Sequence, residues 1–156
     1  MKFDDLNRWM TLIASAGVIA GLLLLAFELQ QNRDMMRAQT RNEIALGIID
    51  LLSLTASNPQ LASVVRRGDA GEELTPDEYF QYRRNVIATL RYYENVHYQY
   101  QQGLYDKPQF ERGKQAWKAY ALRSPGAQHI WCELRDAFVE DFVREWETLM
   151  ADTYRC

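Results

Sequence analysis

The pair of residues with the clearest chemical potential in this sequence is a glutamate and a histidine three positions apart, Glu94 and His97. In helical bundles that bind two metal ions, two such Glu-x-x-His pairs point inward and two further glutamates complete the site. This chain has the pair once. Side chains that could supplement it are Glu43, Asp50, His129 and Glu133. A histidine satisfied beside a tyrosine-rich core explains His97 as well, so Glu94 and His97 are only candidate metal ligands.

Other catalytic patterns are missing from the sequence. It has no P-loop, no dinucleotide fingerprint, no HExxH and no nucleophile elbow. Cys132 lies between Trp131 and Glu133, which offer no positive charge to stabilise a thiolate. Cys132 and Cys156 are too few and too far apart to indicate a disulfide framework or a metal knuckle. We interpret them as unpaired thiols, which fits a reducing compartment. We expect no enzyme and no cofactor.

The length and net charge of the chain limit the number of domains it can form and the kinds of partner it can bind. Its 156 residues leave room for one modest domain beside a membrane segment. The net charge of −3 argues against a dedicated nucleic-acid binder, so no nucleic-acid partner is expected.

Residues 9–27 are predicted to cross a lipid bilayer. They carry no charge, and as a helix they extend ~29 Å, about the thickness of the hydrocarbon core. Arg8 and Glu28 bracket the stretch, and Trp9 lies where interfacial aromatics are common. A buried core helix is usually shorter, and a cleavable signal peptide needs a small-residue cleavage site that residues 27–30 lack. We therefore expect an uncleaved anchor.

The positive charges on the two sides of this anchor are nearly equal in number, so they do not decide its orientation. Lys2 and Arg8 precede the span, and Arg33, Arg37 and Arg41 follow it. The thiols interpreted as reduced and the short, easily translocated N-terminal tail favour a cytoplasmic C-terminal domain.

Four prolines mark where helices begin. Asn58, Thr75 and Ser124 each precede a proline and can act as N-caps, and Asp106 precedes Lys107 and Pro108 in the same way. Thr75 and Glu78 form a capping box, while Gly68 and Gly103 are placed to end helices in the left-handed conformation. The expected helices cover about 9–57, 59–67, 76–102, 108–122 and 125–138, with a last one ending near Tyr154.

No strand alternation or repeat occurs, so the predicted fold is all-α: one N-terminal transmembrane helix continuing into a small soluble helical bundle. We divide the chain into a tail and anchor at 1–29, a juxtamembrane helical extension at 30–57 and a helical domain at 58–156. Apolar and aromatic residues recur every three or four positions in the helix of 76–102 and predict its buried face. They are Tyr79, Tyr82, Val86, Leu90, Tyr93, Val96, Tyr100 and Leu104, joined in the core by Trp117, Trp131 and Trp146.

A seam along the long N-terminal helix, with small residues at its membrane end, suggests helix association. Gly17 and Gly21 form a GxxxG element, which lets membrane helices approach closely. The spacing of alternating four and three continues through Met10, Ala14, Gly17, Gly21, Leu24, Glu28, Gln31, Met35, Ala38, Asn42, Ala45 and Ile49. Two interpretations stay open: a close-packed oligomer, or packing of this helix on the helix of 76–102. The predicted oligomer interface is Ala14, Gly17, Gly21, Leu24, Glu28 and Met35.

Arg33, Arg37 and Arg41 follow one another at steps of four on the face opposite the seam. They are predicted to face anionic lipid headgroups, with an ordinary solvated face as the alternative.

Several tracts carry a family resemblance: residues 28–32 at the membrane exit, 58–61, 94–100 with Gly103 and Leu104, and 124–126 leading to Trp131. On these residues the chain resembles a widespread family of uncharacterised bacterial single-pass membrane proteins with a short helical C-terminal domain. The resemblance implies residence in the bacterial inner (cytoplasmic) membrane and implies no activity.

Three functions remain possible. The first is a membrane-anchored assembly or accessory protein that acts by homo-oligomerisation or by docking a membrane-protein partner. The second is a small oligomeric channel with Glu28 at its mouth, although Thr11 and Ser15 are the only polar side chains in the span. The third is a helical-bundle enzyme that binds metal through Glu94 and His97.

Overall fold

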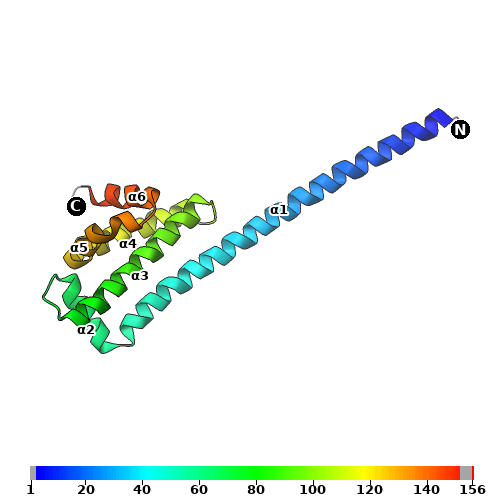
Figure 1. The fold of residues 1–156 in the computed structure, drawn as a ribbon. Helices are drawn as coiled ribbons and strands as arrows, with labels where there is room; N and C mark the ends of the chain where they lie inside the picture. Colours follow the sequence, from blue (N-terminus) through cyan, green and yellow to red (C-terminus); the bar gives the residue numbers. More distant parts are fainter. Residues whose placement is uncertain (1–2, 152–155) are drawn as a thin grey trace. The chain divides into compact units, whose positions relative to one another are not determined.

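The computed structural model describes residues 3–151 and 156, and all regular elements in this part of the chain are helices (Figure 1). A long apolar N-terminal helix is followed by a group of shorter ones, which confirms the all-α class. The elements are α1 (Phe3–Ala56), α2 (Pro59–Asp69), α3 (Pro76–Gln101), α4 (Lys107–Arg123), α5 (Pro125–Leu134), the short 3-10 helix η1 (Arg135–Ala137) and α6 (Glu140–Met150).

The chain falls into two compact units, and α1 contributes to both. One unit ends at Gln39, and the other begins at Thr40 and contains the rest of α1 with all later helices. Residues 40–56, which belong to the expected juxtamembrane extension, group with the later helices in this division.

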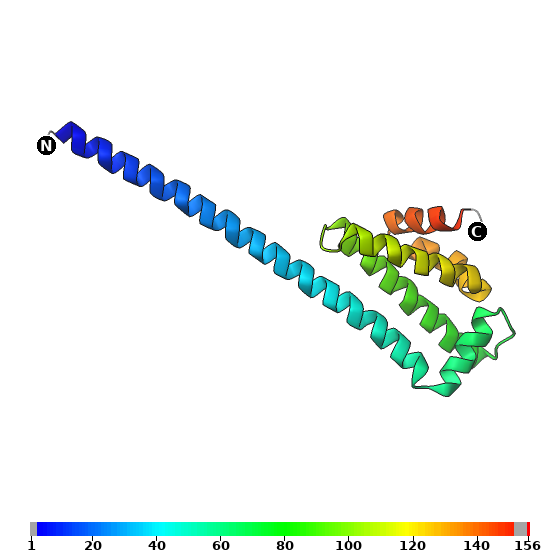
Figure 2. The same cartoon turned by 180° about the vertical axis from the view of Figure 1, so that it is seen from behind.

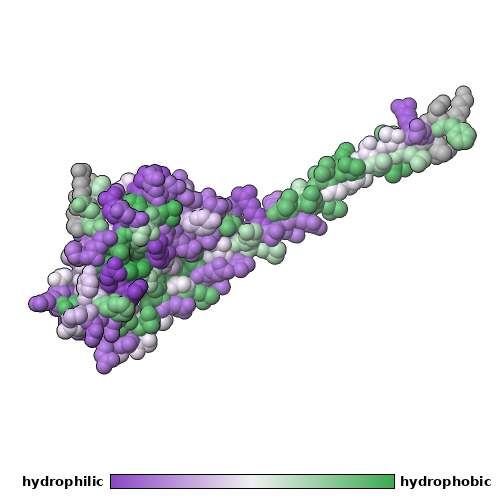
Figure 3. Space-filling view, in the orientation of Figure 1, coloured by the Kyte–Doolittle hydropathy of each residue, from purple (hydrophilic) through white to green (hydrophobic). Residues whose placement is uncertain are grey.

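The N-terminal part of α1 is apolar and exposed. Within the described residues, α1 is the one helix long and apolar enough to cross a membrane, and its most apolar stretch has no buried residues. Leu22, Leu23 and Leu25 are all more than half exposed, and apolar side chains follow one another along this part of the helix in Figure 3. Exposed leucines and valines are unfavourable in water, so this surface is suited to a lipid environment.

Two of the predicted helix starts are capped as expected. The Asn58 side chain accepts the backbone N–H groups of Gln60 and Leu61, each at 3.1 Å. The capping box of Thr75 and Glu78 is formed in both directions. Asp106 and Ser124 also occupy the cap positions of their helices, but neither side chain makes a cap hydrogen bond.

The predicted helix ends agree less well. Gly103 has a φ of 70° and ends α3 as expected. The expectation for Gly68 is wrong, because it is buried within α2, and Gly71, with a φ of 74°, takes the left-handed conformation instead. Helix α5 ends at Leu134 rather than near residue 138. The predicted end of the last helix at Tyr154 lies outside the described residues.

Helix α3 supplies the centre of the core. In Figures 1 and 2 it runs between the C-terminal part of α1 and the group formed by α4, α5 and α6. Most of its predicted buried face is confirmed, but Tyr79 is 37% exposed and is not a core residue. Tyr93 stacks between Trp117 and Trp146, with ring centroids 4.8 and 5.8 Å apart. These large aromatic side chains join α3, α4 and α6 in the core.

Candidate functional site

The C-terminal part of α1 packs on α3 with one side only. Thr40 and Ile44 are buried, and the Tyr92 hydroxyl of α3 donates a hydrogen bond to the Ile44 carbonyl at 3.2 Å. Gly47 lies beside the Tyr92 ring, where a Cβ would be in van der Waals contact at 3.4 Å. The small residue thus allows close packing of the two helices at this point.

The seam lies on another, exposed side of the same helix. Asn42, Ala45 and Ile49 are exposed, and so are Leu46 and Leu52, which are 50% and 63% accessible. The packing side is centred on Ile44, and Ala45 and Ile49 lie roughly 100° and 140° around the helix from it. In residues 40–56 the seam is therefore not the surface that packs on α3, so the second interpretation of the seam is wrong for this segment.

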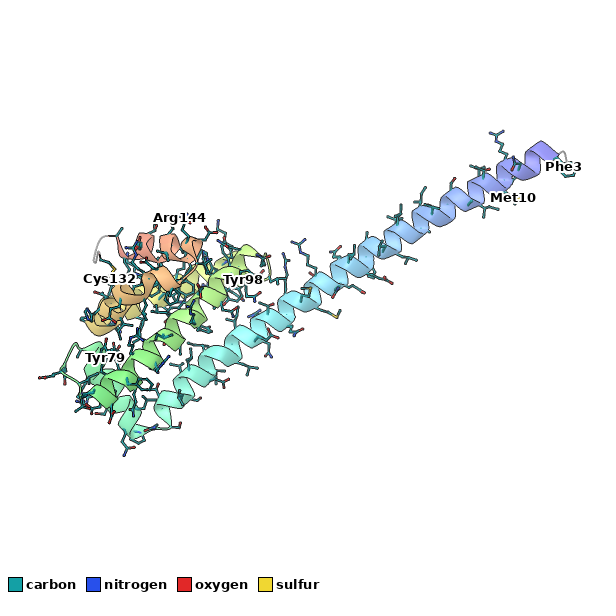
Figure 4. All side chains as sticks on the ribbon, viewed as in Figure 1. Phe3, Met10, Tyr79, Tyr98, Cys132 and Arg144 are labelled. Atoms are coloured by element: carbon teal, nitrogen blue, oxygen red, sulfur yellow. A yellow bond between two sulfur atoms is a disulfide. The ribbon has the colours of Figure 1, made fainter. Side chains whose placement is uncertain are left out.

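The predicted interface residues all lie on the exposed surface of α1. Ala14, Glu28 and Met35 are exposed, and Leu24 is 65% accessible. A Cβ added at Gly17 or Gly21 would have no atom within 4 Å. Figure 4 shows Met10, the first seam residue, with its side chain directed away from the helix. The surface is open to a second helix, and the oligomer interface itself stays a prediction.

The three arginines that were predicted to face lipid headgroups differ in exposure. Arg33 and Arg41 are exposed and Arg37 is half-buried. Burial raises the pKa of Tyr105, and the positive charge of Arg41 acts in the opposite direction, which places Arg41 within electrostatic range of Tyr105. The lipid role of the three residues stays a prediction.

Glu94, one of the two candidate metal ligands, has structural partners for both of its oxygens. Oε1 accepts the backbone N–H of Val139 at 2.9 Å, and Oε2 is 2.6 Å from Nη1 of Arg91. Arg91 also donates to the Ala137 carbonyl at 2.9 Å and lies over the Phe138 ring. Val139 is the N-cap of α6, so this pair fixes the start of α6 on α3.

His97, the other candidate, is buried between aromatic rings. The centroids of Phe110 and Phe142 are 6.0 and 5.9 Å from the imidazole, and Gln101 Nε2 lies 3.5 Å from His97 Nε2. Among the described residues, no group of three or more His, Cys, Asp or Glu side chains is arranged to hold a metal ion. Of the supplementary residues, Glu43 and Asp50 are exposed on α1, and His129 pairs with Glu133 at 3.2 Å. The geometry thus offers Glu94 and His97 no further ligands in this part of the chain.

The environment of His97 predicts a loss of stability in mild acid. Burial lowers the His97 pKa below its ordinary 6.5; Glu145, Asp141 and Glu94 act to raise it and Lys114 to lower it. The unfolded chain takes up this proton near pH 6.5 and the folded chain only at lower pH, so the stability present above pH 6.5 is lost as the pH falls. We expect the melting temperature of the full chain in detergent to fall from pH 7.5 to 5.

The chain has only two histidines, so the assignment can be tested cleanly. His97→Gln should reduce the acid-dependent loss of stability, whereas His129→Gln, at an exposed position, should leave it in place. An unchanged acid-dependent loss in His97→Gln would show that another group causes it.

A polar cluster that the sequence analysis did not identify lies between α3 and α5. The Tyr79 hydroxyl donates to the Glu133 carboxylate at 3.4 Å, and Arg83 Nε is 3.7 Å from the same group. It borders a cavity of about 260 Å³ whose lining includes Gly71, Leu74, Tyr82, Pro125 and His129. Figure 4 labels Tyr79 at this end of α3. The alternating charges neutralise one another, which suits a structural link better than a binding site for an ion.

A second polar group, which shares Tyr82 with the lining of this cavity, joins three helices. The Tyr82 hydroxyl donates to Asp69 Oδ1 at 2.9 Å, and the Ser124 hydroxyl also bonds the Asp69 carboxylate. Burial raises the Asp69 pKa, although both hydrogen bonds act to lower it. Ser124 is therefore used for this internal link, which explains why it does not cap α5.

The interpretation of the cysteines as unpaired thiols is wrong. Cys132 in α5 and Cys156 form a disulfide, with Cα atoms 5.4 Å apart. Figure 4 labels Cys132 in α5. Their 24-residue separation says nothing about distance in space, because η1 and α6 turn the chain back toward α5. The argument for a reducing compartment therefore no longer holds.

The chain has no significant match among models of protein families, curated proteins or solved structures.

Proposed function

We propose that the protein is a membrane-anchored assembly protein, in which the apolar part of α1 crosses a bacterial inner membrane and copies associate along the outer side of α1. The observation that carries the proposal is that one side of α1 is buried within the helical domain while the seam side is exposed. Ile44 accepts a hydrogen bond from Tyr92 of α3 and Thr40 is buried, whereas the seam residues Asn42, Ala45 and Ile49 are exposed. A helix that already has an intramolecular packing side retains a second side with the spacing of helix association.

A second copy of this chain is the partner that fits this surface best. Copies of a single-pass protein insert with the same orientation, so their α1 helices are parallel and equivalent residues meet across a two-fold axis. Gly17 and Gly21 then allow close approach in the bilayer. Ile49 and Leu52, which are 53% and 63% exposed, become covered in water, where burial of apolar area is favourable. The arrangement works for either orientation in the membrane.

Enlarging the seam glycines is expected to disrupt the assembly. In native mass spectrometry from mild detergent, the wild-type chain should give a discrete homo-oligomer, and Gly17→Leu with Gly21→Leu should give mainly monomer, because leucine prevents close backbone approach. The matched control is Ser15→Leu with Ala26→Leu. These small residues lie on the other side of α1, Ala26 being nine residues, or roughly 180°, from Gly17. Equal stoichiometry in all three proteins would remove the seam from the proposal.

Cross-linking tests the water-exposed part of the seam. Ala45 lies on the seam, and Leu54, nine residues later, lies roughly 180° away and is 57% exposed. In a chain with Cys132→Ser and Cys156→Ser, Ala45→Cys should form a disulfide-linked dimer in membranes at least ten times faster than Leu54→Cys. Equal rates, or faster linking at Leu54, would contradict a parallel pair that meets along the seam.

A further inference from the structure

We propose that the helical domain lies on the extracytoplasmic side of the membrane and that the Cys132–Cys156 disulfide forms there. This reverses the cytoplasmic placement expected from the sequence, and it rests on the membrane anchoring in the proposed function. The observation behind it is that the only two cysteines of the chain are paired with each other. Structural disulfides persist in oxidising compartments and are rare where thiols are kept reduced.

The position of the bond identifies it as structural. Cys132 is half-buried and packs against the core, beside Trp131, which is 3% exposed. Cys156 lines a cavity together with Trp131, Trp146 and Met150, the last two from α6. A salt bridge of 3.0 Å between Arg135 and Glu147 joins η1 to α6 at the same place. The disulfide therefore links the chain that follows α6 to α5 and reinforces the packing of α6 on the core. Among the described residues, no other covalent bond does this.

The chemistry needs an oxidant that the cytoplasm does not supply. When the S–S bond forms, the two thiols lose two protons and two electrons, and the disulfide of a thiol oxidase accepts them and becomes a dithiol. Such exchange takes place in the extracytoplasmic space, so the domain must cross the membrane before its thiols are oxidised.

The charges around the span allow this orientation. Arg8 precedes the apolar stretch, and Arg33, Arg37 and Arg41 follow it over a longer segment. Positive charges oppose translocation most strongly close to the span, and the two sides are nearly balanced. The cysteine pair is then the feature that distinguishes the two orientations, and it favours an extracytoplasmic domain.

Accessible reporter cysteines provide the test. In the full chain with Cys132→Ser and Cys156→Ser, single cysteines are placed at Asp136, whose side chain is fully exposed, or at Phe3, which is 91% exposed. Spheroplasts are treated with a membrane-impermeant maleimide before and after lysis. We expect Asp136→Cys to react equally in both cases and Phe3→Cys to react at least ten times more after lysis. The reverse pattern would overturn the proposal.

The wild-type chain gives a second readout that does not depend on the reporter variants folding. Cells are quenched with acid and free thiols are alkylated with a mass-tagged maleimide. No tag is expected before reduction and two tags after it. Two tags before reduction would contradict the disulfide. Recovery of the chain in the soluble fraction would instead show that the anchoring is wrong, whereas a membrane-bound chain with reactive Phe3→Cys and protected Asp136→Cys would contradict only the orientation.

Discussion

Gly126→Ala is expected to destabilise the helical domain by about 3 kcal/mol or more, the upper end of the cost of overpacking. A Cβ at Gly126 would lie 2.0 Å from the carbonyl oxygen of Gly68 and 3.0 Å from the hydroxyl oxygen of Tyr82. The first of these atoms belongs to the backbone of α2 and cannot rotate away. Helices α2 and α5 would have to separate, and the hydrogen bonds from Tyr82 and Ser124 to Asp69 would be strained or lost.

The measurement is denaturant-induced unfolding of the full chain in detergent, followed by tryptophan fluorescence, because Trp117, Trp131 and Trp146 are in the core. Gly113→Ala is the matched control. Gly113 is also within a helix, but its Cβ would have only Trp117 Nε1 nearby, at 3.8 Å. Alanine has a higher helix propensity than glycine, so this variant should be unchanged or more stable by up to ~1 kcal/mol. Equal midpoints for the two variants would show that the crossing of α2 and α5 relaxes freely.

The same crossing shows why some helix ends could be predicted from the sequence and others could not. The N-caps at Asn58 and Thr75 depend on side chains within three residues, so local sequence determines them. Gly68 has the residue type of a helix end, yet it is required by the Tyr82 ring, which a Cβ would approach to 2.5 Å. That contact comes from α3, fourteen residues later, and no local signal reports it.

The core was largely predictable because its periodicity is strong. Tyr82, Leu90 and Tyr93 repeat at helical spacing and are buried as expected. Tyr79 has the same spacing but lies one turn before Tyr82, in the N-terminal turn of α3, where its hydroxyl reaches Glu133 at the surface. Periodicity gives the direction of a side chain around a helix, and it does not show where the neighbouring helices end.

The surface of α1 that forms the candidate site could be predicted only in part, because spacing alone does not show which side of a helix is covered. The spacing identified the seam on α1, and it did not show which side of α1 packs on α3. Thr40 and Ile44 decide this, and a threonine is an unremarkable residue in a sequence. Likewise, Glu94 and His97 have the spacing of metal ligands, but Glu94 is engaged by Arg91, one turn earlier on α3, and by the N–H of Val139. The sequence separation of Glu94 and Val139 is 45 residues, so only the tertiary fold brings this second partner close.

Removal of the disulfide is expected to lower the stability of the domain by about 3 kcal/mol, because a loop of this length restricts the unfolded chain by roughly that free energy. The covalent loop runs from Cys132 to Cys156, a separation of 24 residues. In detergent, the wild-type chain should melt roughly 10 °C lower when a reductant is added. Weaker attachment of α6 should also expose Trp146, which is 4% exposed in the folded domain, and shift its fluorescence to longer wavelength.

Cys132→Ser with Cys156→Ser separates the effect of the bond from that of the reductant. This variant should melt at the temperature of the reduced wild-type chain and should not respond to reductant at all. If the oxidised and reduced wild-type proteins melted together, the disulfide would contribute no stability. A domain that requires the bond for its full stability would be handicapped in a reducing compartment. The size of this effect therefore measures how strongly folding itself favours the extracytoplasmic side.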